Sequence, residues 1–156
     1  MARRQRLLCI RDRHVLEPAA YPELRELSFG TWEGMSFSAV ETAYPGQIKE
    51  RMKSVATFQA DGGETYPQLQ ARVVQKYEEI VARHPDDQIA MVCHGGVNRV
   101  ILSHLLGIPL DKIFRIHQDY AALNIIQYYD KEPVVEYIGN AELFSSQKDE
   151  IKTAIQ

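Results

Sequence analysis

The fold of this chain is decided by residues 88–99, Q-I-A-M-V-C-H-G-G-V-N-R. An apolar run at 89–93 leads into His94, two glycines follow, and an amphipathic segment continues over 97–106. This order predicts a buried strand, a tight turn and a helix. A histidine at the carboxyl end of a strand, facing the first amides of a helix, lies where open α/β sheets bind ligands. Those amides and the helix dipole favour an anion, so we expect phosphate chemistry.

Length and composition predict one globular domain over residues 1–156. Hydrophobic residues make up 45% of the chain and charged residues 25%, an ordinary balance for a globular protein. The net charge of −3 argues against a nucleic-acid partner held by a positive field. The sequence has no apolar run of membrane-spanning length, no signal peptide and only two cysteines. We therefore expect a cytoplasmic protein that binds neither nucleic acid nor membrane.

Helices and strands alternate along the rest of the chain. Apolar residues recur at helical spacing over 69–81, behind a capping box formed by Thr65 and Gln68. Two β-rich runs, at 122–129 and 134–137, are separated by a turn signal and predict a hairpin. The prediction is an α/β layered sheet that ends in an antiparallel hairpin.

His94 is the first candidate for chemistry. A lone histidine can be structural, but Gly95 and Gly96 would let a ligand approach the backbone at the start of the helix. Cys93 would point to the opposite face of the strand, so we expect it in the core and not in a nucleophilic pair with His94. The histidines and cysteines show none of the usual metal-ligand spacings, and no metal site is predicted.

Glu26 is the second candidate. It lies in a loop crowded by apolar residues, where partial desolvation would raise the pKa of its carboxyl group and suit it to general acid catalysis. The alternative is an ordinary solvated carboxylate. Glu33 lies in the same loop, and local reasoning does not choose between the two. The glycine loop at 62–65 could add amides to an anion site, but it lacks the lysine and the spacing of a P-loop.

Four short motifs follow one another along most of the chain. They are L-R-E-L-S-F-G-T-W-E-G at 24–34, G-G-E-T at 62–65, V-C-H-G-G-V-N-R at 92–99 and G-I-P-L at 107–110. Their order and spacing resemble the histidine phosphatase superfamily, whose fold is that of phosphoglycerate mutase. The short interval between Glu26 and His94 resembles the small phosphatases, such as α-ribazole phosphatase and the broad-specificity phosphatases. The resemblance implies a three-layer αβα sheet.

The resemblance also implies roles for single residues. Glu26 would give a proton to the leaving oxygen, His94 would hydrogen-bond the phosphoryl oxygens, and Gly95 would offer backbone contact. The implied reaction is hydrolysis of a phosphomonoester on a small metabolite through a phosphohistidine, with no cofactor and no metal. The implied ligand is a phosphomonoester or inorganic phosphate.

One motif of the family is missing from this sequence. The family's phosphate-accepting histidine lies in an Arg-His-Gly motif at the end of the first strand, and the 156 residues contain no such tripeptide. The resemblance therefore implies a single incomplete domain, truncated at its N-terminus and lacking its first strand. Arg3 or Arg4 would be the phosphate-binding arginine of the helix that normally follows.

Two consequences follow from a missing first strand. Hydrolysis would be impaired, and the chain would instead be an inactive module that binds phosphate or a phosphoester, or an interaction protein. An unpaired sheet edge would favour a homodimer. We treat impaired hydrolysis as the main expectation and the two non-catalytic roles as its alternatives.

Overall fold

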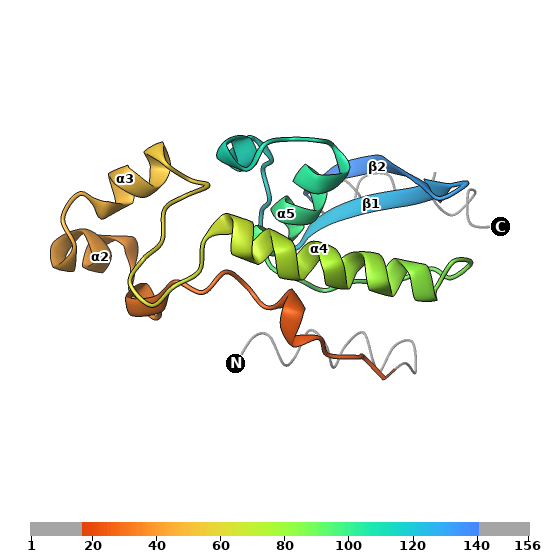
Figure 1. Cartoon of the computed structure of the whole chain (residues 1–156), viewed down its shortest axis with the longest axis horizontal. Helices are drawn as coiled ribbons and strands as arrows, with labels where there is room; N and C mark the ends of the chain where they lie inside the picture. Colours follow the sequence, from red (N-terminus) through yellow and green to blue (C-terminus); the bar gives the residue numbers. More distant parts are fainter. Residues whose placement is uncertain (1–16, 141–156) are drawn as a thin grey trace.

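The computed structural model describes residues 17–140, which form helices and one hairpin (Figure 1). The elements are η1 (Pro22–Leu24), η2 (Gly30–Trp32), α2 (Phe37–Ala43), α3 (Gln47–Lys53), α4 (Tyr66–Arg83), α5 (Gly95–Leu105), η3 (Leu110–Arg115), β1 (Ala122–Tyr129) and β2 (Glu132–Asn140). The predicted α/β class is confirmed by this mixture. None of the described helices is both long and apolar enough to cross a bilayer.

Helix α4 is the longest described element and forms one layer of the fold. Its capping box is present as predicted, because the Thr65 hydroxyl accepts from the Gln68 amide and the Gln68 side chain accepts from the Thr65 amide. The buried face of the helix carries Leu69 and Val73, which are both fully excluded from solvent. Burial of this stripe fixes the orientation of α4 against its neighbours.

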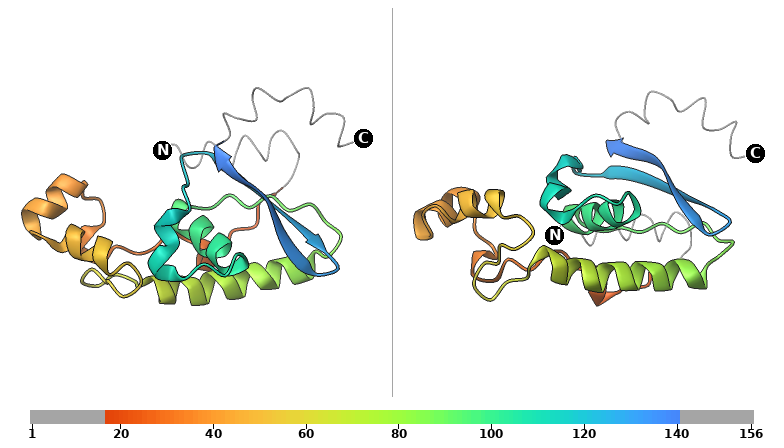
Figure 2. Two further views of the ribbon diagram at one scale, coloured as in Figure 1. Left: turned by 90° about the horizontal axis from the view of Figure 1, so that it is seen from above. Right: turned by 45° about the horizontal axis from the view of Figure 1, so that its top comes forward.

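Helix α5 lies between α4 and the hairpin (Figure 2). Its core-facing residues Val97 and Val100 are fully buried and pack in one cluster with the apolar face of α4. Gly107, which follows the helix, has a φ of +64°, a left-handed conformation that glycine adopts without strain. The helix begins at Gly95, two residues before the predicted start, so His94 is its N-cap residue.

The predicted hairpin is confirmed and forms the other outer layer. Strands β1 and β2 pair antiparallel, with a register shift between Ile125 and Ile126. Asp130 and Lys131 have φ values of +50° and +75°, the conformation of a tight hairpin turn. β2 begins at Glu132, two residues earlier than predicted, because the turn occupies only two residues.

The strand predicted at 89–93 is wrong for the described part of the chain. The only ladder within residues 17–140 is the pair β1–β2, and 89–93 runs extended without strand hydrogen bonds. An isolated extended segment is no strand, because ladder bonds need a neighbour at the correct spacing. Val92 is 54% exposed, as expected where no neighbouring strand covers the segment.

Helices α2 and α3 project from the rest of the molecule at the end opposite the hairpin turn (Figures 1 and 2). The hydroxyl of Ser36 caps α2 by accepting from the Ala39 amide at 3.2 Å. The indole of Trp32 packs under these helices with Val40 and Ala60 in a second, smaller apolar cluster. These elements therefore have their own core, next to the layers that hold the candidate site.

Candidate active site

The start of α5 is built as an anion-binding helix end. His94 has extended backbone angles, φ −122° and ψ 163°, and its carbonyl accepts the first helical bond from Asn98 at 2.8 Å. The amides of the first turn, which include those of Gly95 and Gly96, have no acceptor inside the helix. They therefore face outward from the helix end, where a negative group is stabilised.

The negative group that lies there is Glu26. Its Oε2 accepts from the Gly96 amide at 3.1 Å, and its Oε1 accepts from the Leu27 amide at 2.9 Å. An added Cβ on Gly96 would overlap Oε1, so this close approach requires glycine. The sequence predicted that glycines at 95–96 would admit a ligand, and in the structure Gly96 admits the carboxylate of Glu26.

The structure separates Glu26 from Glu33, which local reasoning from the sequence did not do and for which only the family resemblance favoured Glu26. Glu33 is exposed and accepts from the Phe29 amide at 2.7 Å, within its own turn. Glu26 is half-buried and contacts α5, 70 residues away in sequence. Only Glu26 of these two is in position to act together with the His94 region.

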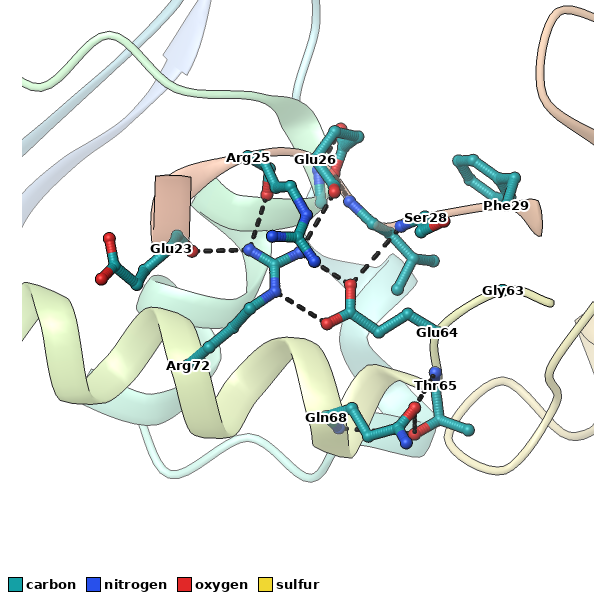
Figure 3. Close-up of polar contacts among 12 residues, drawn as sticks. Glu23, Arg25, Glu26, Ser28, Phe29, Gly63, Glu64, Thr65, Gln68 and Arg72 are labelled. Atoms are coloured by element: carbon teal, nitrogen blue, oxygen red, sulfur yellow. Dashed lines mark hydrogen bonds and ion pairs between the residues drawn. The ribbon is translucent and has the colours of Figure 1, made fainter. Parts of the chain in front are cut away.

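The loop that carries Glu26 is held by an ion pair from the glycine-loop motif and α4 (Figure 3). Arg72 contacts both carboxylate oxygens of Glu64, each at 2.7 Å. Burial alone would raise the pKa of Glu64, but the bond to Arg72, its charge and the Ser28 amide hold that pKa below its ordinary value. Glu64 is therefore ionised at neutral pH and forms a charge-assisted pair.

Two further arginines, which the sequence analysis missed, lie near Phe114. The guanidinium carbon of Arg99 is 5.7 Å from the ring centroid, and that of Arg51 is 5.1 Å from it. A Cβ added at Gly95 would come within 3.1 Å of Arg99 Nη1, which places this guanidinium at the start of α5. The signal for Arg99 was its position one helical turn after Gly95, which puts both on one face. Nothing local marks Arg51.

The Tyr66 hydroxyl is affected by the charges of both arginines and of Glu26. Its ring packs edge-on against Phe114, with centroids 6.0 Å apart. Burial raises the pKa of the Tyr66 hydroxyl, the charge of Arg51 opposes the shift, the charge of Glu26 adds to it, and that of Arg99 opposes it. The region around the α5 start thus combines one carboxylate with two guanidinium groups.

Cys93 is half-buried, and burial together with the charge of Glu26 raises the pKa of its thiol to about 11. The thiol is therefore protonated at neutral pH and a poor nucleophile. This agrees with the prediction that Cys93 does not serve as a nucleophile beside His94. Within residues 17–140 no group of three His, Cys, Asp or Glu side chains could hold a metal ion. Arg3 and Arg4 lie outside the described residues.

Comparison with known proteins identifies the family. A profile of the histidine phosphatase superfamily, branch 1, matches residues 3–141. The chain belongs to this superfamily. Its relatives include phosphoserine phosphatase 1 of Hydrogenobacter thermophilus, which is 26% identical over 120 residues, or 77% of this chain and 57% of that protein. A glucosyl-3-phosphoglycerate phosphatase of Mycolicibacterium vanbaalenii is 30% identical over 95 residues, or 56% of this chain and 42% of that protein.

Solved structures of the superfamily have the same fold. YhfR of Bacillus stearothermophilus superposes with a TM-score of 0.75 at 22% identity, over 84% of this chain and 65% of that one. The α-ribazole phosphatase of Shigella flexneri superposes with a TM-score of 0.73 at 18% identity, over 84% and 65%. These superpositions show the fold, and the predicted family is confirmed by the profile match over residues 3–141. The chain spans 57% of the length of the phosphoserine phosphatase that it matches.

Proposed function

We propose that this chain carries part of a phosphomonoesterase site that acts on a small phosphorylated metabolite through a phosphohistidine. The observation that supports this most directly is the carboxylate of Glu26 at the start of α5, bonded to the Gly96 amide two residues after His94. Membership of the histidine phosphatase superfamily supports the type of reaction.

The proposed roles are those of an acid and of phosphate-binding donors. In the first step the ester P–O bond breaks while a P–N bond forms to a histidine, and Glu26 protonates the leaving alkoxide. In the second step water attacks the phosphohistidine, its proton returns to Glu26, and phosphate and free histidine are formed. His94, the Gly95 amide and either Arg3 or Arg4 would hold the phosphoryl oxygens as charge moves onto them.

The nucleophile is the part that this chain does not offer in the family's usual form. The 156 residues contain no Arg-His-Gly tripeptide, and we assign the nucleophilic role to none of the five histidines. We therefore expect phosphate binding with little or no turnover. Phosphate binding and turnover would both use His94 and the α5 amides, but turnover also needs a histidine that accepts the phosphoryl group.

Two measurements on the full chain test the proposal. Inorganic phosphate, titrated to millimolar concentration, should shift the His94 ring resonances with saturation, and His94→Ala should lose the binding. With p-nitrophenyl phosphate the chain should be nearly inactive. The absence of any saturable shift would overturn the proposed site. Substantial turnover that disappears in His94→Ala would overturn the proposed loss of the nucleophile.

A non-catalytic role is the second candidate, as an inactive phosphate-binding module or as a homodimer that pairs an exposed edge. The extended segment 89–93 supports it, because no ladder covers this segment in the described residues and Val92 is 54% exposed. Light scattering over a range of protein concentrations tests the edge, since a monomer at every concentration excludes it. Saturable phosphate binding by an inactive monomer is expected of the impaired phosphomonoesterase and of the binding module alike, and it would exclude the homodimer.

A further inference from the structure

The pair Glu64–Arg72 does more than neutralise two charges in the interior. Their side chains are only 12% and 16% exposed, and their contact is bidentate. An arginine has five N–H donors, and three of those on Arg72 go to backbone carbonyls instead of to Glu64. One of these carbonyls belongs to Glu23 in η1, and the other two belong to Arg25 and Glu26 directly after it.

The three bonds from Arg72 all reach one short stretch of backbone, residues 23–26 (Figure 3). Arg72 Nη1 donates to the carbonyls of Glu23 at 2.5 Å and Arg25 at 2.9 Å, and Nη2 donates to the carbonyl of Glu26 at 3.1 Å. On the other partner, Glu64 Oε2 accepts from the Ser28 amide at 3.4 Å. The two side chains thus hold the backbone on both sides of Glu26.

The backbone positions of Arg72 and Glu64 are themselves fixed by packing and by the cap of α4. Arg72 lies between the fully buried Leu69 and Val73 of α4, so its backbone is fixed in the core. Glu64 directly precedes the capping box at Thr65, which fixes where the helix begins. Because their backbone is fixed, Arg72 and Glu64 can hold the segment that carries Glu26 in one position, and catalytic groups need such precise placement.

The other end of Glu26 is held by α5, where its carboxylate accepts from the Gly96 amide. Glu26 is therefore fixed twice, by its carbonyl to α4 and by its carboxylate to α5. We propose that Glu64 and Arg72 are positioning residues that hold the Glu26 carboxylate at the start of α5. Neither residue would contact substrate, and the catalytic meaning of this role rests on the proposed function of Glu26.

The energetics favour positioning over simple stabilisation. A buried ion pair contributes little net stability, because desolvation offsets the attraction and an apolar pair of similar volume is often as stable. The three bonds to the 23–26 backbone are what an apolar pair would not supply. A lysine would not supply them either, because its single ammonium group cannot reach five acceptors in a planar fork.

Amide hydrogen exchange at Gly96 tests this positioning without any need for turnover. The Gly96 amide lies in the first turn and has no helical acceptor, so its protection reports the docked Glu26 carboxylate. The Val100 amide, in the buried middle of α5, reports the stability of the helix itself. We would compare both amides in Glu64→Gln, Arg72→Met and Arg72→Lys, with Glu26→Gln as a reference.

The matched control is Arg83→Met. Arg83 lies on the same helix, but its ion pair with Glu79 is on the surface, with 59% of the arginine side chain exposed. Removing it takes away one guanidinium from α4 without touching the Glu26 loop. It should leave the exchange of both amides unchanged.

We expect all three variants of the Glu64–Arg72 pair to speed exchange at Gly96 by about tenfold or more while Val100 changes little. Equal loss at both amides, unchanged protection at Gly96, or unfolding of the mild Glu64→Gln variant would each overturn the inference. Normal exchange in Arg72→Lys would also contradict it. If the exchange results hold but phosphate fails to bind, the proposed function fails while the positioning role stands.

Discussion

Gly96→Ala is the most direct perturbation of the contact between Glu26 and α5. The added methyl carbon would overlap Glu26 Oε1 and lie 3.2 Å from the Cδ atom of the same carboxylate. The atoms in its way belong to the end of a flexible side chain and not to backbone. We therefore expect the carboxylate to swing away while α5 stays in place.

The magnitude follows from two opposing changes at residue 96. Losing the 3.1 Å bond from the amide to a carboxylate removes about 1.5–3 kcal/mol locally. Replacing glycine by alanine within a helix returns up to about 1 kcal/mol. The free energy of unfolding should therefore fall by about 0.5–3 kcal/mol, whereas the amide at 96 should exchange about 10- to 100-fold faster after correction for residue type.

The assay combines urea unfolding with hydrogen exchange, and the neighbouring glycine supplies the control. In Gly95→Ala the added Cβ meets Arg99 Nη1 at 3.1 Å and does not approach Glu26. Its Gly96 amide should keep its protection. Full protection at residue 96 in Gly96→Ala would refute the reasoning, because it would mean that Glu26 is not what protects this amide.

Three further predictions concern the elements that support the site. Thr65→Ala removes the cap of α4 and should lower the free energy of unfolding by about 1 kcal/mol in urea, against no change for the exposed Thr57→Ala. Lys131→Gly should raise the melting temperature, because Lys131 has a φ of +75°, where glycine is unstrained and other residues lose about 1 kcal/mol; Lys131→Ala should give no such gain. Because the folded-state pKa of Glu64 is lowered, its contribution to stability is complete above its ordinary pKa of 4.5 and is lost as the pH falls through the folded value. Stability measured from pH 6 to pH 3 should therefore fall less steeply in Glu64→Gln than in the unchanged chain.

The parts of the fold that the sequence predicts well are those set by local chemistry. The capping box at Thr65 and the helical spacing behind it mark where α4 begins and which face it buries. The two-residue turn at Asp130–Lys131 marks the hairpin in the same way. In both cases the interacting groups lie within a few residues of one another.

The parts that the sequence does not predict depend on partners far along the chain. Residues 89–93 have the composition of a strand, but strand formation needs a neighbour, and the described residues supply none. Local sequence reasoning could not choose between Glu26 and Glu33, because the contact that distinguishes Glu26 is with the Gly96 amide, 70 residues away. Arg72 had no local signal, because its carbonyl acceptors lie 46 to 49 residues away.

Because Glu26 occupies the start of α5, residues 88–99 need a different interpretation from the one that their sequence suggests. The sequence predicted an open anion site at the start of α5, yet the carboxylate of Glu26 already accepts from the Gly96 amide there. The proposed roles divide the amides of this helix end, since the Gly96 amide holds Glu26 and the Gly95 amide would contact the phosphoryl oxygens. By holding Glu26 there, as in our inference, Glu64 and Arg72 would place the proposed acid directly beside the amide proposed to bind phosphate.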